Sequence, residues 1–225
     1  MSTRLWVVNS ELVYPFEEAM FHGAAERGGA DSQLSMGLPA KALLASPLAL
    51  YRNAFRMPDV FRPRGTFVVS DRVRRLLGHV QNVHFSPVTF ARLFELEWRR
   101  GERSERLLNR WMELGHDSWL PVFREMEHRP DLVQRVGPYC EVLAALQVDV
   151  APNYSGLKQV SVGHPSLPRI PILSSLTSEL GLSEQMLEDY PILNVGVGLL
   201  IRDDLFQRLR PHLDPEFMAA EPQDL

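Results

Sequence analysis

The chain has 225 residues, of which 45% are apolar and 23% are charged, and its formal net charge is −4. No apolar run approaches the ~18 residues needed to span a bilayer, and the start of the chain turns polar early, so neither a membrane span nor a secretory signal is expected. A single cysteine, Cys140, excludes an internal disulfide and a cysteine-based metal site, and its expected role is that of a buried structural thiol. These features are typical of a cytoplasmic globular protein.

The apolar pattern predicts the secondary-structure elements in chain order. A strand is expected at Leu5–Val8 and a helix from Phe16 to Arg27, ended by Gly28 and Gly29. Residues 30–64 contain four prolines and are expected to be rich in loops. Further helices are predicted at 102–115, at 118–128 and from Ser183, and further strands at Leu157–Val162 and Ile192–Ile201. The segment that starts at Pro138 is apolar and fits a helix or a strand.

Residues 66–88 and 198–220 repeat one pattern and align without a gap at an offset of 132. Each copy begins with three or four apolar residues, which is typical of a strand buried on both faces. A polar break then supplies oxygens that can cap a helix, Ser70-Asp71 in the first copy and Asp203-Asp204 in the second. The apolar helix faces expected to be buried are Val73, Leu76 and Leu77 in the first copy, and Leu205, Phe206 and Leu209 in the second.

Each copy closes with a return strand, and the gapless alignment places Phe85 of the first opposite Phe217 of the second. The elements together predict an α+β fold, in which a mixed sheet carries packed helices and the two copies form similar strand-helix-strand units. No low-complexity linker divides the chain, so residues 1–225 are expected to form a single globular domain.

Charge is distributed unevenly along the chain. Residues 51–110 carry 13 arginines and 6 acidic residues, whereas residues 111–225 carry 17 acidic and 8 basic residues. Arginines at 72–110 would suit nucleic acid if exposed aromatic residues lay between them. Phe90, Phe94 and Trp98 instead recur every fourth residue, which favours one buried face of a helix or a long strand. The favoured interpretation is that these arginines pair with the acidic second half or lie solvated on the surface.

Candidate catalytic residues each have a structural interpretation. Ser70 resembles a nucleophile, but no base stands beside it in the sequence, so a helix cap is its expected role. His22 and Glu26 would share one face of the predicted helix, yet a zinc site needs further ligands. His116 and Asp117 stand at a helix junction, where Asp117 is expected to cap the next helix.

The remaining motifs are weaker. His79 and His84 flank a turn at a spacing that does not favour a metal, and Gly196-x-Gly198 lacks the third glycine of a dinucleotide site. The sequence therefore predicts no catalytic residue, no cofactor and no metal.

The run from Gly65 to Leu77, followed by Asn82–Val88, resembles the signature of a bacterial immunity-protein family encoded beside polymorphic toxins. In that family a strand ends in Val-Ser-Asp or Val-Ser-Glu, a helix follows, and a strand like Gly-x-x-Phe-x-Pro-Val closes the unit. The C-terminal copy departs from the signature at Arg202, where the family has serine. The resemblance implies a cytoplasmic, non-enzymatic protein that binds and neutralises a cognate toxin by occlusion, with the toxin encoded by an adjacent gene. It implies no particular toxin-binding residue.

Toxin neutralisation is the expected function, and the acidic residues of 111–225 would suit a basic toxin because acidic surfaces steer association with basic partners. Replacing surface acids of this half by lysine should then weaken binding. Two alternatives stay open. A site assembled from His116, Asp117 and His164 would make the chain a small hydrolase or transferase, and the arginines of 72–110 would make it a nucleic-acid binder whose affinity falls steeply with salt.

Overall fold

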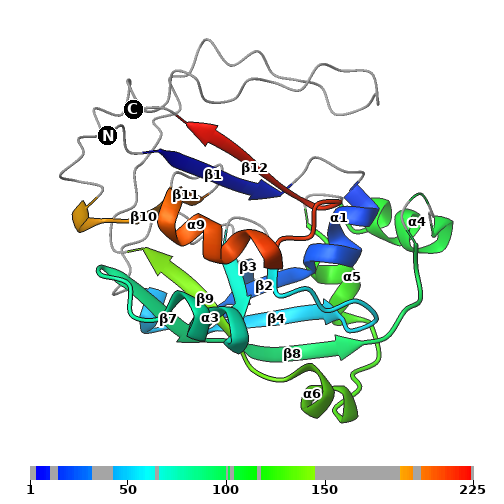
Figure 1. Ribbon diagram of the computed structural model, residues 1–225. Helices are drawn as coiled ribbons and strands as arrows, with labels where there is room; N and C mark the ends of the chain where they lie inside the picture. The colour runs from blue at the N-terminus through cyan, green and yellow to red at the C-terminus, as the bar shows by residue number, and fades with distance from the viewer. Residues whose placement is uncertain are drawn as a thin grey trace.

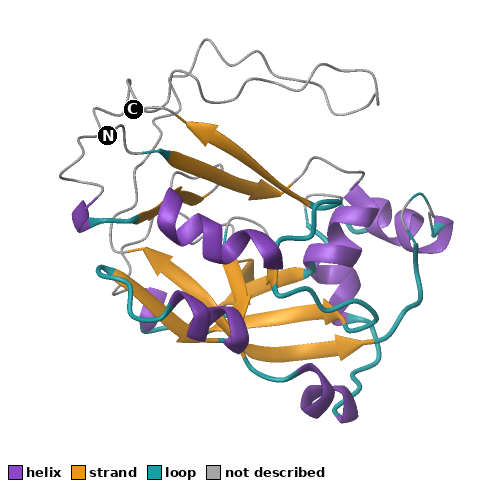
Figure 2. Ribbon diagram, in the orientation of Figure 1, coloured by secondary structure: helices purple, strands orange, loops and turns teal. Residues whose placement is uncertain are grey.

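The computed structural model describes residues 4–10, 15–31, 43–63, 66–99, 101, 104–115, 118–144, 188–194 and 199–223. These residues form three four-stranded sheets with short helices packed against them (Figures 1 and 2), which confirms the α+β class. The strand pairing is mixed, as expected, but it is divided among three sheets rather than gathered in one.

Two of the three sheets, called A and C, have equivalent strand orders. Sheet A has the order β10 (Ile192–Asn194), β11 (Leu199–Arg202), β1 (Leu5–Ser10) and β12 (Met218–Gln223). Sheet C has the order β5 (Val60–Phe61), β6 (Phe67–Ser70), β9 (Tyr139–Ala144) and β7 (Val83–Pro87). All neighbours in both sheets are antiparallel, and a helix follows the second strand of each, α9 (Asp203–Leu209) in A and α3 (Asp71–Leu77) in C. The sequence repeat is therefore a structural repeat. Each structural copy also includes an outer strand, β10 or β5, and a central strand, β1 or β9, that lie outside the repeated sequence pattern.

Strand register shows where the two copies differ. Leu199 pairs with Val8 as Phe67 pairs with Val142, so Val8 and Val142 are equivalent positions of the central strands. On the other side, Val8 faces Ala220 and Val142 faces Phe85. The counterpart of Phe85 is thus Ala220, and the gapless alignment is wrong after the helix. The second copy contains three additional residues there, and a 3-10 helix, η2 (Arg210–His212), follows α9 in that part of the chain.

Sheet B is built from strands outside the two copies and has the order β3 (Ala30–Asp31), β2 (Ala24–Arg27), β4 (Leu48–Asn53) and β8 (Thr89–Phe94). The β4–β8 pair is parallel and the other pairs are antiparallel. The helix predicted from Phe16 to Arg27 is wrong in its second half, because α1 (Pro15–His22) ends at His22, directly before Gly23. Gly23 has φ +77°, and a Cβ there would lie 2.7 Å from the Tyr51 carbonyl oxygen. The chain therefore turns at this glycine and continues as a strand. The segment 30–64, expected to be loop-rich, contributes the strands β3, β4 and β5.

Three further helices follow β8 in the chain. The predictions at 102–115 and 118–128 are confirmed by α4 (Glu105–Glu113) and α5 (Leu120–Arg124), whereas α6 (Asp131–Val136) was not expected. The predicted strand at Leu157–Val162 and the helix start at Ser183 lie outside the described residues.

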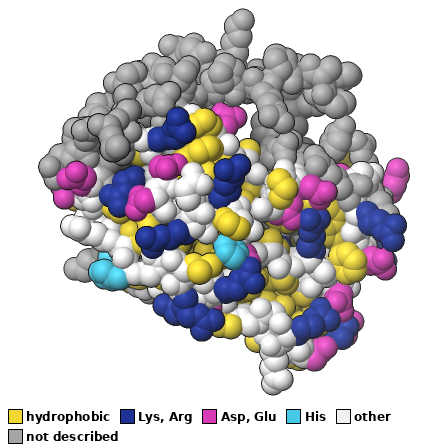
Figure 3. Space-filling view, in the orientation of Figure 1, with side chains coloured by type: hydrophobic (Ala, Val, Ile, Leu, Met, Phe, Trp, Pro, Cys, Tyr) yellow, Lys and Arg dark blue, Asp and Glu magenta, His cyan; other side chains and the backbone are white. Residues whose placement is uncertain are grey.

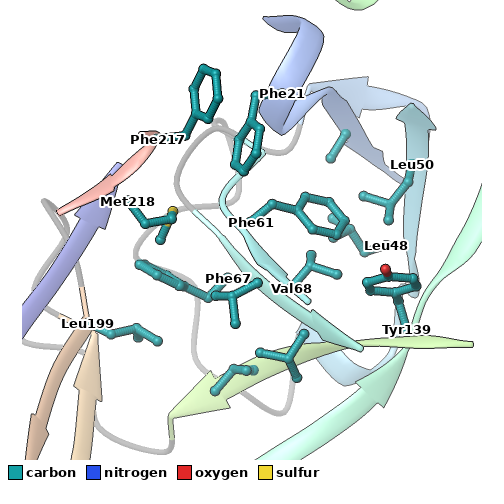
Figure 4. Packing of buried hydrophobic residues seen from close by; sticks show 14 of the residues in the cluster. Phe21, Leu48, Leu50, Phe61, Phe67, Val68, Tyr139, Leu199, Phe217 and Met218 are labelled. Atoms are coloured by element: carbon teal, nitrogen blue, oxygen red, sulfur yellow. The ribbon is translucent and has the colours of Figure 1, made fainter. Parts of the chain in front are cut away.

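One hydrophobic cluster includes residues of all three sheets. Figure 4 shows Phe21 of α1 between Phe61 of β5 and Phe217, which directly precedes Met218 at the start of β12. The Phe21 and Phe217 rings stack with centroids 4.1 Å apart. The buried faces of α3 and α9 are those expected, with one exception: Leu76 is 47% exposed, because the helix turns it away from the sheet.

Candidate binding site at the seam of the two copies

The two repeat helices, α3 and α9, contact each other and lie side by side on one face of the molecule (Figure 1). Polar side chains from both copies meet beside them. We call this set the seam cluster. From the first copy and the segment just before its strand β5, it contains Arg56, Asp59, Ser70 and Arg72. From the second copy, it contains His212, Asp214 and Glu216.

Asp59 is the centre of the seam cluster. Its Oδ1 accepts a hydrogen bond from the Ser70 hydroxyl at 2.6 Å, and its Oδ2 lies 2.9 Å from Arg72 Nη2 and 2.8 Å from His212 Nδ1. Partial burial raises the pKa of the Asp59 carboxyl, but the hydrogen bonds from Ser70 and His212 and the Arg72 charge outweigh it and lower the pKa. The carboxylate is therefore stabilised in its ionised form by groups from both copies.

Ser70 has the capping role that the sequence predicts. Its Oγ accepts a hydrogen bond from the backbone N–H of Val73 at 3.3 Å while it donates to Asp59. The equivalent N-cap of α9 is Arg202, whose side chain makes no capping bond, and the oxygens at this helix start come from Asp204, whose carboxylate accepts from the backbone N–H groups of Asp204 and Leu205. A nucleophilic serine needs a base that can take its proton, and a carboxylate with a lowered pKa is a poor one.

His212 can occupy two hydrogen-bonding states. Arg72 Nη2 lies 2.9 Å from His212 Nδ1 as well as from Asp59 Oδ2. Because a guanidinium only donates, an unprotonated Nδ1 accepts from Arg72, whereas a protonated Nδ1 donates to Asp59. Both states keep the two copies connected through the same carboxylate.

An open groove of about 380 Å³ runs along the seam. Arg56 forms ion pairs with Asp214 and with Glu216, the latter at 3.1 Å, and its guanidinium lies 5.3 Å from the Phe217 ring centroid. The groove is lined by Arg56, Pro58, Asp59, Pro211, His212, Leu213, Asp214, Pro215 and Glu216. Paired charges and prolines on an open surface suit contact with another protein better than enclosure of a small substrate.

The structure separates His22 from Glu26, so their expected pairing on one helix face is wrong. His22 ends α1 and is buried, and its Nδ1 accepts from the backbone N–H of Arg62 at 3.1 Å. Burial, together with the positive charges of Arg52 and Arg62, lowers the pKa of His22 to about 3. Glu26 lies on β2, where it accepts from the Tyr51 hydroxyl at 2.8 Å.

Other sequence candidates lie apart from the seam. Cys140 is buried on β9, as expected, and burial raises the pKa of its thiol. His79 and His84 are exposed on either side of a turn. Within the described ranges, no three His, Cys, Asp or Glu side chains are arranged to hold a metal ion. His116, Asp117, His164, Gly196 and Gly198 fall outside those ranges.

Among the described ion pairs, the expected pairing of the 72–110 arginines with the acidic second half holds for Arg110, whereas Arg72, Arg74 and Arg75 pair with acids of the first half. Arg56 pairs with Asp214 and Glu216, and Arg110 pairs with Glu125 at 2.6 Å. Among the described residues, the second-half acids that form ion pairs with arginine are Glu113, Glu125, Asp131, Glu141, Asp204, Asp214 and Glu216. These pairs weaken the expectation of an acidic docking surface.

Comparison of the chain with protein-family models, with curated proteins and with solved structures finds no match. None of the helices among the described residues is long and apolar enough to cross a membrane.

Proposed function

We propose that the chain is a bacterial immunity protein that neutralises a cognate toxin by binding it and covering its active surface. The observation that carries this proposal is the fold of the segment that resembles the family signature. Its strand (β6), Ser70-capped helix (α3) and closing strand (β7) belong to one sheet-and-helix unit, in which β6 and β7 both pair with β9. A second copy of that unit lies beside it, and the two present adjacent helices and one seam groove to the outside.

The chemistry of the seam supports binding over catalysis. The Ser70 hydroxyl is held between the α3 cap and Asp59, and the Asp59 carboxylate is held by Arg72 and His212. Such interlocked groups fix a surface in one shape, which lowers the entropic cost of docking a partner. The same groups would have to break these contacts before they could take part in a reaction.

Co-expression with the product of the adjacent reading frame tests the proposed function. We expect the chain to restore growth of cells that express this product and to co-purify with it in a fixed stoichiometry. Growth rescue without any complex would point to an enzyme that repairs the damage, and a toxic neighbour that the chain neither binds nor neutralises would reject the proposal.

A further inference from the structure

We infer that the partner is a protein that binds the outer face of the two repeat helices through an acidic surface of its own. We call this the arginine face, and its residues are Arg72, Arg75 and Leu76 of α3, Arg208 of α9 and Arg210 of η2. The inference rests on the proposed function and names the binding surface and the chemistry of its partner.

The repeat places these residues together. Val73 and Leu77 of α3, and Leu205 and Leu209 of α9, are buried against the sheets, so the opposite sides of both helices face solvent. The helices contact each other, and dark blue arginine side chains are visible over both in Figure 3. Two short helices thus contribute to one continuous surface.

Several of these charges are available to a partner. Arg208 and Arg210 are exposed and form no ion pair with any residue that the structure describes. The Arg75 side chain is 69% exposed and lies 3.3 Å from Asp71, and such surface pairs contribute little energy. Arginine forks bind carboxylates with two parallel hydrogen bonds, so this set suits a surface rich in Asp and Glu.

Leu76 gives the arginine face an apolar contact point. It is 47% exposed, and the equivalent position in the second copy is Arg208, so exposure of a leucine is not required by the shared fold. Interfaces combine apolar contacts with arginine, and an exposed leucine beside arginines has that composition.

A protein partner fits this face better than a nucleic acid. Among the large apolar side chains that the structure describes as exposed, Phe55 is the one aromatic residue, so the arginine face offers no base-stacking platform. Asp71 and Asp204 also lie on the two helices and would repel phosphates. A protein surface can place a cation opposite each of these acids, whereas a uniform phosphate backbone cannot.

Charge reversal on the arginine face tests the inference. The variant carries Arg75→Glu and Arg208→Glu, and the matched control carries Arg129→Glu and Arg135→Glu on or beside α6, which are also exposed. With the co-purified partner, we expect the first variant to lower the association rate about tenfold or more at low salt, because rim charges act mainly on encounter. The control should stay within about twofold of the wild type. Leu76→Ala should instead raise the dissociation rate.

A probe that needs no partner completes the test. At low salt, poly-L-glutamate should bind the wild type and the control, and binding should be lost in the Arg75→Glu/Arg208→Glu variant, whose fold is checked by circular dichroism. Equal partner binding by both charge variants would overturn the arginine face and leave the proposed function intact. Tighter binding of RNA than of poly-L-glutamate, or no binding of poly-L-glutamate to the wild type, would also overturn the acidic-protein assignment.

Discussion

His22 is a base that the fold keeps neutral. Its pKa is lowered to about 3, so between the ordinary value of 6.5 and pH 3 the unfolded chain binds a proton that the folded chain excludes. Stability contributed by neutral His22 is therefore complete above pH 6.5 and is lost as the pH falls, by up to on the order of 5 kcal/mol. His22→Gln keeps an acceptor for the Arg62 N–H and should remove this slope in urea unfolding between pH 7.5 and 5. An unchanged slope in the variant would show that other groups cause the acid sensitivity.

Two buried arginines, Arg27 and Arg52, should differ in what they contribute to the free energy of unfolding. Arg27 lies 2.5 Å from the buried Glu141 carboxylate. Arg52 is fully buried over the Phe61 ring and has no carboxylate partner among the described residues. Burial lowers the pKa of Arg52 to about 9. Arg27→Met leaves a carboxylate unpaired and should cost about 3–5 kcal/mol. Arg52→Met removes an unpaired charge and should leave the free energy of unfolding unchanged or raise it. Denaturant unfolding that gives the same loss of unfolding free energy for Arg27→Met and Arg52→Met would contradict this prediction.

At the scale of elements, the two repeat helices differ in their caps. Ser70→Ala removes the α3 cap and should destabilise the protein by about 1–2 kcal/mol, because an N–H of the first turn loses its acceptor. Arg202→Ser introduces an N-cap hydroxyl for α9 and removes the partly exposed Arg202–Asp204 ion pair, which contributes little, so it should be neutral or stabilising by up to about 1 kcal/mol. Thermal unfolding of both variants measures the difference. If Arg202→Ser destabilised as much as Ser70→Ala, capping would not be what distinguishes the helices.

Local signals predicted the elements that depend on local contacts. The Ser70 cap, the strand β6 and the helices α4 and α5 follow from patterns within a few residues. The pattern of Ala24–Arg27 fits both a helix and a strand, so the sequence does not predict the turn at Gly23. The turn depends on a distant contact, because the Tyr51 carbonyl oxygen approaches Gly23 so closely that a Cβ would not fit. Leu76 was assigned to the core because its spacing fits the apolar face, whereas the position of the sheet leaves it exposed.

At the scale of the whole molecule, Asp59 links the two copies and its effect depends on pH. Its pKa is lowered, so its contribution to stability is present above the ordinary value near 3.8 and is lost as the pH falls through the lower folded value. Asp59→Asn should destabilise the protein at pH 7, and its difference from the wild type should shrink below about pH 4. A difference that persists at low pH would assign the effect to packing rather than to charge.

The repeat could be predicted from the sequence, but the seam cluster could not. Asp59 is 11 residues from Ser70 and 153 residues from His212, and no spacing rule connects groups that only sheet pairing brings together. The three additional residues of the second copy, near η2 and His212, became visible only from strand register. The candidate site thus depends on the part of the repeat where the two copies differ.

The measurement that tests toxin neutralisation most directly is a titration of the adjacent gene product's toxic activity with purified chain. Occlusion predicts that activity falls linearly and reaches zero at a fixed stoichiometric ratio, independent of incubation time. Loss of activity at far lower amounts of chain, increasing with time, would contradict binding as the mechanism and identify the chain as an enzyme.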